Sequence, residues 1–160
     1  MDLLDFVAGQ ARQGGSAAPG AAPGERFVAF ADWTPEALAA LRGLGTVERV
    51  ASGAHIIEAG ARGERDLFVI ASGDLEVYRA RGPQEQRLAL LGPGDLVGEM
   101  SFVDGGPRSA SVRALTPSRV LRVRPGDLDG LRERAPAAAL DFMREIARIL
   151  SFRLRVSTPE

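Results

Sequence analysis

The sequence predicts a mainly β fold with flanking helices: one helix, then an antiparallel β-roll, then two more helices. Two observations carry this prediction. Over residues 46–124, short apolar runs alternate with turns that contain Gly or Pro, as in a sheet of short antiparallel strands. On either side, apolar residues recur at the three- and four-residue steps of a helix. The chain has 160 residues, 45% of them hydrophobic and 26% charged, which suits one globular domain.

The N-terminal residues 1–26 are expected to form a flexible leader outside the domain. Residues 9–24 are mostly Gly, Ala and Pro, and such a segment cannot bury enough apolar surface to offset the entropy lost on ordering. The domain is therefore placed at residues 27–160.

The first helix is expected to begin after Thr34, because an N-cap residue, a proline and an acidic residue follow one another at positions 34–36. It should run for about ten residues. Gly43 and Gly45 are expected to stop it, since glycine is a common residue at helix C-termini.

Seven strands are expected to follow, separated by Gly- or Pro-containing turns. Their spacing of roughly 8–12 residues leaves no room for the crossover helices of a parallel sheet. The predicted strands are residues 47–51, 55–58, 67–71, 75–80, 87–91, 109–114 and 119–123.

Two helices are expected after the roll, at residues 125–134 and 136–156. The second helix is apolar over a wide arc. Its apolar residues form a stripe of Leu140, Met143, Ala147, Leu150 and Leu154, and a neighbouring row of Phe142, Ile146, Ile149 and Phe152. Because this arc is too wide for an exposed helix, the helix either packs fully on the roll or seals a homodimer through residues 136–156.

Composition excludes several classes of function. The chain has 21 acidic and 20 basic residues, a formal net charge of −1, which argues against nucleic-acid binding through bulk positive charge. All 20 basic residues are Arg, and Cys is absent, so lysine chemistry, thiolate chemistry and disulfides are excluded. With His55 as the lone histidine, no His-rich metal site is expected, and His55 is assigned a structural role.

The distribution of apolar and charged residues adds two expectations. No apolar run approaches the ~18–20 residues that span a bilayer, and the N-terminus has no signal-peptide pattern, so a cytoplasmic protein without membrane attachment is expected. Residues 1–107 contain 9 Arg and 15 acidic residues, whereas residues 108–160 contain 11 Arg and 6 acidic residues. The sign of the charge therefore changes at Arg108.

Residues 94–112 interrupt the strand pattern and carry the candidate site. Gly98 can adopt backbone conformations that other residues resist, and residues 99–103 fit one helical turn, whose free N–H groups attract an anion. Arg108 opens the next strand, so it would face this turn and complete a receptor for phosphate or carboxylate, with Glu99 across the cavity. The alternative is that Glu99 and Arg108 form an ordinary ion pair that steadies the loop.

The motifs GEM at residues 98–100 and PRSASV at residues 107–112 resemble the phosphate-binding cassette of the cyclic nucleotide-binding domain family. The similarity extends to LFVIASG at residues 67–73 and LLGPGDLVGE at residues 90–99. It implies an antiparallel, eight-stranded β-roll (a jelly-roll). The six residues between Gly60 and LFVIASG, one more than is usual, are expected to enlarge a turn and leave the pocket unchanged.

The resemblance implies a role for each residue of the cassette. Arg108 would pair with the exocyclic oxygens of a cyclic phosphate, Glu99 would bind the ribose 2′-hydroxyl, and Ser109 would donate to the phosphate. Gly98 and Met100 would line the ribose phosphate through their backbones. The further contacts implied are Ser101 and Ala110 in the cassette, Val97, Leu88 and Val112 beside the base, and Arg153 or Phe152 as a lid that stacks on the base.

The implied function is that of a cytoplasmic sensor that binds cAMP without catalysis and changes the position of its C-terminal helices. Ser109, directly after Arg108, favours cAMP, with cGMP as the second ligand. No cofactor or metal is expected. An enzyme is disfavoured because the sequence has neither a second histidine nor a recognisable metal-binding cluster.

Two alternatives stay open. The chain could be a regulatory fragment of a larger transcription factor, channel or kinase, or a family member that has lost nucleotide binding. Direct DNA binding is not expected, because the sequence ends at Glu160, soon after the long helix and without a helix-turn-helix segment. Output is then expected to pass to an unidentified effector protein.

Overall fold

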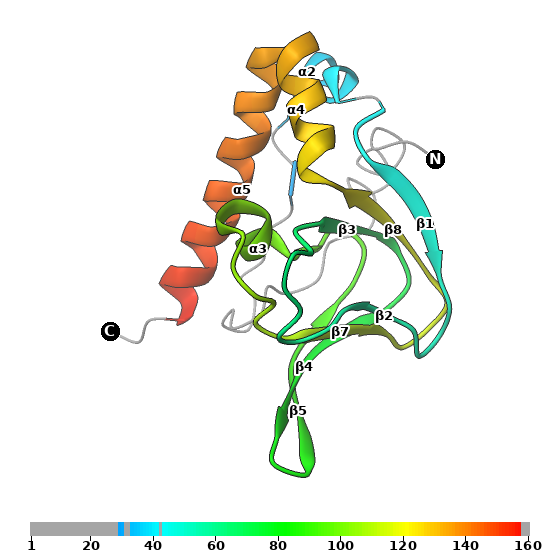
Figure 1. Cartoon of the computed structure of the whole chain (residues 1–160). Coiled ribbons are helices and arrows are strands. Elements are labelled where there is room, and N and C mark those ends of the chain that lie inside the picture. Colours follow the sequence, from blue (N-terminus) through cyan, green and yellow to red (C-terminus); the bar gives the residue numbers. More distant parts are fainter. Residues whose placement is uncertain (1–28, 31–32, 42, 158–160) are drawn as a thin grey trace.

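The computed structural model describes residues 29–30, 33–41 and 43–157. The expected leader, residues 1–26, lies outside these described residues. The mainly β fold is confirmed, since eight antiparallel strands form two four-stranded sheets and two helices follow them (Figure 1). The last helix runs along one side of the roll, and a hairpin projects at the end away from the helices (Figure 1).

The eight strands pair in two sheets of four. In hydrogen-bonding order, the first sheet is made of β1 (Thr46–Val50), β8 (Ser118–Val123), β3 (Leu67–Ser72) and β6 (Leu96–Val97). The second sheet is made of β2 (His55–Ile57), β7 (Ser111–Ala114), β4 (Leu75–Arg81) and β5 (Gln84–Leu91). The seven predicted strands are all present with small shifts at their ends. The eighth, β6, is too short to show as an apolar run in the sequence.

Strand β3 separates two hydrophobic clusters. Its residues Phe68 and Ile70 are buried with the inward residues of the second sheet, in the interior of the roll. Leu67 and Val69 alternate with them and are buried in the second cluster, which includes Phe142 and other residues of the helices. Because successive side chains of a strand point to opposite faces, burial on both faces explains the unbroken apolar run of this strand.

The first helix, α2 (Pro35–Ala40), is shorter than expected. Thr34 caps it as predicted, because its side-chain oxygen accepts a hydrogen bond from the Ala37 N–H at 3.2 Å. The prediction of about ten residues is wrong, since the chain leaves the helical conformation at Leu41. Leu41 and Leu44 are instead buried in the cluster between roll and helices, so tertiary packing ends the helix before the glycines.

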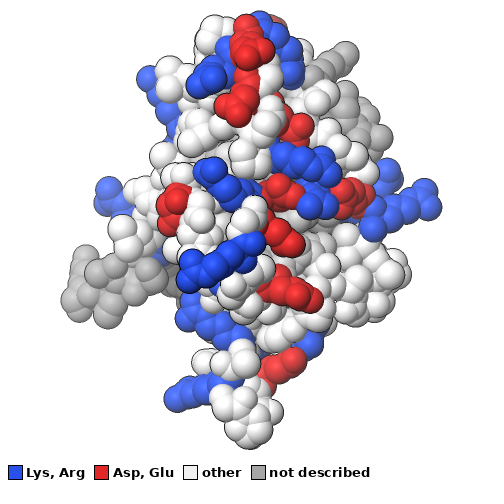
Figure 2. All heavy atoms as spheres, viewed as in Figure 1, with Lys and Arg blue, Asp and Glu red and all other residues white. Residues whose placement is uncertain are grey.

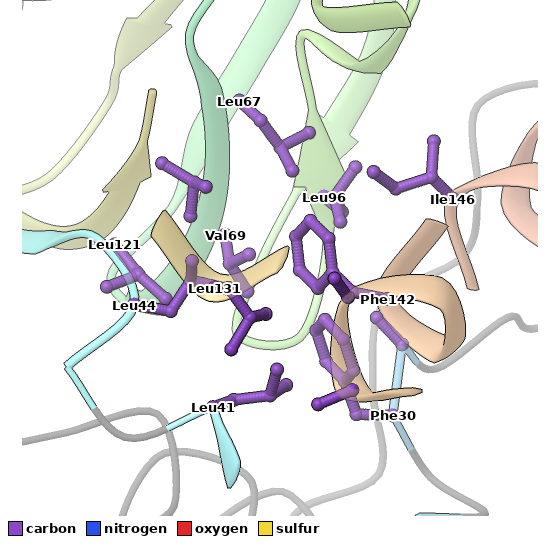
Figure 3. Packing of buried hydrophobic residues seen from close by; sticks show 14 of the residues in the cluster. Phe30, Leu41, Leu44, Leu67, Val69, Leu96, Leu121, Leu131, Phe142 and Ile146 are labelled. Atoms are coloured by element: carbon purple, nitrogen blue, oxygen red, sulfur yellow. The ribbon is translucent and has the colours of Figure 1, made fainter. Parts of the chain in front are cut away.

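The C-terminal helices are α4 (Pro125–Arg134) and α5 (Pro136–Ser157), close to the predicted bounds. In the row of α5 that contains Phe142, Ile146 and Ile149, these three residues are buried and Phe152 is half-buried. The rings of Phe30 and Phe142 stack with centroids 6.0 Å apart (Figure 3). Leu140 and Leu154, in contrast, are 53% and 67% exposed. The alternative in which α5 packs fully on the roll is therefore wrong. No helix among the described residues is long and apolar enough to cross a membrane.

Folding mixes the charges that are separated along the sequence. On the face in Figure 2, acidic and basic side chains are interspersed. Ion pairs join the two halves of the chain, as between Arg122 and Asp66 at 2.5 Å and between Arg113 and Glu85 at 2.7 Å. The excess of Arg after residue 107 therefore produces no continuous basic surface on this face.

A buried carboxylate anchors the β4–β5 hairpin. Glu76 is 3% exposed and accepts hydrogen bonds from Arg87 at 2.6 Å and from Arg113 at 2.7 Å. Burial would raise the pKa of Glu76, but the two guanidinium groups outweigh burial and hold this pKa below its usual value. Arg113 in addition lies over the ring of Tyr78, 4.2 Å from its centroid.

We predict that Phe142→Ala lowers the free energy of unfolding by about 3–5 kcal/mol, because it leaves a cavity between α5 and the roll. Urea unfolding followed by the fluorescence of Trp33, which packs against the same cluster, measures the loss. Arg144→Ala on the exposed side of α5 is the control and should change stability by no more than about 0.5 kcal/mol. Equal unfolding midpoints for both variants would contradict this account of the core.

Candidate functional site

A cavity of about 600 Å³ lies between the roll, the 94–112 segment and α5. This volume is typical of sites for small organic ligands. The residues that line the cavity are Ile57, Val77, Arg79, Val97, Gly98, Glu99, Met100, Ser101, Arg108, Ser109, Ala110, Val112, Leu150, Arg153 and Leu154. The strands of the roll, the 94–112 segment and α5 thus each contribute residues to the cavity wall.

Nearly all of the residues proposed from the sequence as ligand contacts line this cavity. They are Val97, Gly98, Glu99, Met100, Ser101, Arg108, Ser109, Ala110, Val112 and Arg153. Leu88 is not among the lining residues, and its expected contact with the base stays a prediction. On β5, Ala89 pairs with Val77 and Arg87 with Tyr78, which makes Leu88 the extra residue of a β-bulge. A bulge breaks the alternation of faces, and Leu88 is 38% exposed.

Gly98 joins β6 to the short helix α3 (Glu99–Asp104), which replaces the single turn expected over residues 99–103. Its φ of +87° favours glycine strongly. A Cβ at this position would lie 2.7 Å from the carbonyl oxygen of Asp66 and 2.9 Å from Nη1 of Arg108. The absence of a side chain therefore lets the backbone of the cassette approach Arg108.

Backbone atoms hold both the side chain and the main chain of Arg108. Its Nη2 donates to the carbonyl of Asp66 at 2.7 Å, and its Nη1 donates to the carbonyl of Gly98 at 3.2 Å. Its own backbone pairs with the preceding turn, through Gly60 N–H to Arg108 O at 2.8 Å and Arg108 N–H to Ala61 O at 3.0 Å. The turn over residues 61–66 thus helps to position the central cation, and the expectation that its extra residue leaves the pocket unchanged stays a prediction.

The Arg108 guanidinium is buried without a counter-ion. The residue is 5% exposed, its Nε has no hydrogen-bond partner, and no carboxylate of the described residues lies within 4.0 Å. Burial lowers the pKa of Arg108 from its ordinary value, although Glu64, Asp66 and Glu99 act in the opposite direction. Since arginine keeps its proton in proteins and an unpaired buried charge is costly, this position favours an anionic ligand.

Glu99 forms its ion pair with Arg153 of α5 and not with Arg108. Its carboxylate, on a residue that is 6% exposed, accepts a hydrogen bond from Nη1 of Arg153, and Nη2 of Arg153 donates to the carbonyl of Leu96. The alternative of a Glu99–Arg108 ion pair is therefore wrong. Arg153 is committed to Glu99 in this arrangement, and its stacking role as a lid stays a prediction. Phe152 is not among the residues that line the cavity.

Five residues of the cavity wall were not predicted from the sequence: Ile57, Val77, Arg79, Leu150 and Leu154. Arg79 was detectable, because it follows Val77 by two residues on β4 and therefore lies on the same face of the strand. Its Nε donates to the carbonyl of Ser109 at 2.9 Å. The described residues contain no group of three or more side chains that could hold a metal ion.

Comparison with known proteins identifies relatives of the chain. A family model described as the cyclic nucleotide-binding domain matches residues 47–135. The cyclic AMP receptor protein of Thermus thermophilus is 42% identical over 90 residues, which cover 56% of this chain and 40% of that protein. The CRP-like cAMP-activated global transcriptional regulator of Mycobacterium tuberculosis is 33% identical over 122 residues, 76% of this chain and 52% of that protein. The chain thus spans about half the length, or less, of these relatives.

A solved structure supports the same relationship. The N-terminal domain of a transcriptional regulator from Streptomyces coelicolor has a TM-score of 0.68 and 31% sequence identity. The match covers 82% of this chain and 94% of that domain. The likeness therefore extends over most of both chains.

Proposed function

The chain belongs to the cyclic nucleotide-binding domain family, and on this premise we propose that it is a sensor that binds cAMP and transmits binding through helix α5. One observation carries the proposal: the buried Arg108 guanidinium has an unpartnered Nε and no carboxylate partner at the wall of a ligand-sized cavity. An anion that enters the cavity relieves this uncompensated charge.

A cyclic nucleotide matches the groups of the cavity. Its phosphate carries one negative charge and acceptor oxygens for the guanidinium of Arg108, and charge-assisted hydrogen bonds of this kind are the strong ones. Ser109 lies next to Arg108 and supplies a hydroxyl. Glu99 can accept a hydrogen bond from a ribose hydroxyl, and the apolar wall of Val97 and Val112 suits a base.

We assign cAMP as the preferred ligand and cGMP as the second ligand. Ser109 directly after Arg108 favours cAMP over cGMP. The names of the relatives from Thermus thermophilus and Mycobacterium tuberculosis both refer to cyclic AMP. Binding without catalysis is part of the proposal, because Glu99 is the lone carboxylate among the lining residues and is paired with Arg153. Because those relatives are longer, the partner that reads the signal is either an effector protein or a further domain of a larger regulator.

The contact between Glu99 and Arg153 suggests how binding reaches α5. A ribose hydroxyl that hydrogen-bonds to Oε1 of Glu99 competes with Nη1 of Arg153 for that oxygen. Release of Arg153 removes a contact that holds the C-terminal half of α5 on the cassette. A ligand shifts such an equilibrium only by its differential affinity for the two states, and here the difference arises at the Glu99 carboxylate.

A second copy of the chain is our proposal for the partner that covers the exposed side of α5. Leu140, Met143, Ala147, Leu150 and Leu154 follow the alternating three- and four-residue steps of a two-helix seam. Leu140 and Leu154 are largely exposed. Pairing of two α5 helices would remove this apolar surface from water.

We predict that Arg108→Ala weakens cAMP binding at least about thirtyfold, the loss typical for one partner of a buried charge pair. Isothermal titration of both proteins with cAMP and cGMP measures it, and cAMP should bind the wild-type protein more tightly. Arg132→Ala on the exposed face of α4 should bind like the wild-type protein. Unchanged affinity of Arg108→Ala would refute the assignment of the phosphate site.

We predict that Arg153→Ala increases cAMP affinity several-fold, because the competitor for Glu99 is gone, and abolishes the ligand-dependent change in amide hydrogen exchange along α5. Arg155→Ala, an exposed residue of the same helix, is the matched control. A loss of affinity in Arg153→Ala would show instead that this side chain contacts the ligand as a lid.

We predict that Leu140→Glu converts a dimer into a monomer, because it places a charge in the apolar seam. Light scattering during size exclusion should give twice the 16.9 kDa chain mass for the wild-type protein and the single chain mass for the variant. Arg132→Glu controls for the added negative charge. A monomeric wild-type protein would contradict the proposed seam.

A further inference from the structure

Arg79 is an exposed residue of β4 that follows two buried apolar residues on the same face of the strand. Leu75 and Val77 precede it at two-residue intervals and are buried in the interior of the roll. Because alternate residues of a strand share one face, Arg79 lies on this same face, and it lines the cavity beside Val77. A cationic side chain therefore ends the apolar row at the cavity wall.

The guanidinium of Arg79 is held in place but is not neutralised. Its Nε donates to the carbonyl of Ser109 at 2.9 Å, and it has no other hydrogen bond or ion pair with the described residues. The nearby acidic side chains of β4 and β5 are engaged elsewhere, since Glu76 binds Arg87 and Arg113, and Glu85 binds Arg113. Most of the donors and the planar face of Arg79 thus stay available to a ligand.

No other planar side chain of the cavity wall is free in this way. None of the lining residues is aromatic. The Arg108 guanidinium is held between two carbonyls, and the Arg153 guanidinium is bound to Glu99. Nucleobases stack on planar, weakly hydrated guanidinium groups, so Arg79 is the stacking surface that this cavity offers.

We propose that Arg79 is the platform on which the base of the bound cyclic nucleotide stacks, an inference that rests on the proposed function. The Ser109 carbonyl fixes the platform next to the residue that follows Arg108, so base and phosphate are bound by adjacent groups. Stacking increases with the area of the ring system. Arg79 therefore selects purine over pyrimidine cyclic nucleotides and leaves the choice between adenine and guanine to other contacts.

Competition with a fluorescent cAMP derivative tests this inference, with five competitors: cAMP, cGMP, cCMP, cUMP and ribose 3′,5′-cyclic phosphate without a base. For Arg79→Ala, we expect cAMP and cGMP to bind about five- to thirtyfold more weakly, with a smaller loss for the two pyrimidine nucleotides. The ligand without a base should bind the variant and the wild-type protein equally. Arg79→Lys should lose most of the stacking contribution although it keeps the charge.

Arg81→Ala is the matched control, because Arg81 lies on the same strand two residues further on, is exposed and is absent from the cavity wall. This variant should bind every competitor like the wild-type protein. Equal losses for cAMP and for the ligand without a base would overturn the inference, since Arg79 would then act on the phosphate. Unchanged cAMP binding by Arg79→Ala would overturn it as well. Failure of the wild-type protein to bind any cyclic nucleotide would instead refute the proposed function.

Discussion

The candidate site depends on one constraint: the buried charge of Arg108 must be held by backbone carbonyls until an anion reaches it. Two carbonyls, from Asp66 and Gly98, accept its hydrogen bonds. Gly98 must be a glycine for its carbonyl to come so close, and Gly60 pairs with the backbone of Arg108. Arg108 therefore connects two separate turns, one through both its backbone and its guanidinium group and the other through its guanidinium group, and the cavity forms where these turns meet the roll.

The sequence was sufficient for the features that arise from local patterns. Apolar runs and Gly- or Pro-containing turns predicted seven of the eight strands, because each of these strands contains a short apolar run that ends at a turn. The bounds of α4 and α5 followed from their initial prolines. Local patterns did not predict two features. Strand β6 has only two residues, and α2 ends early because Leu41 is buried in the hydrophobic cluster. In both cases tertiary contacts override the local signal.

The membership of the cavity wall was largely predictable, whereas the partners of its charged residues were not. A compact motif placed Gly98, Glu99 and Arg108 together, but the Glu99 carboxylate pairs with Arg153 of α5 and not with Arg108. The outcome, a pair between Glu99 and Arg153, joins residues 54 positions apart. This pairing depends on how α5 packs against the roll, which local sequence patterns do not determine. The bulge at Leu88 was not predictable either, because it depends on how β5 pairs with β4. An extra residue in such a pairing is not visible in the sequence pattern of one strand.

The geometry of α5 has a consequence for how the chain responds to its own concentration. In the apolar stripe of this helix, Leu154 is exposed and Leu150 is half-buried against the hydrophobic cluster, and both line the cavity. Whatever packs on the stripe touches the same two side chains as a molecule in the cavity, so the two events share a free energy of coupling. Such coupling is reciprocal: if association tightens ligand binding by some factor, ligand tightens association by the same factor. If the chain pairs through α5 as proposed, the ligand concentration needed for half-saturation depends on the abundance of the protein as well.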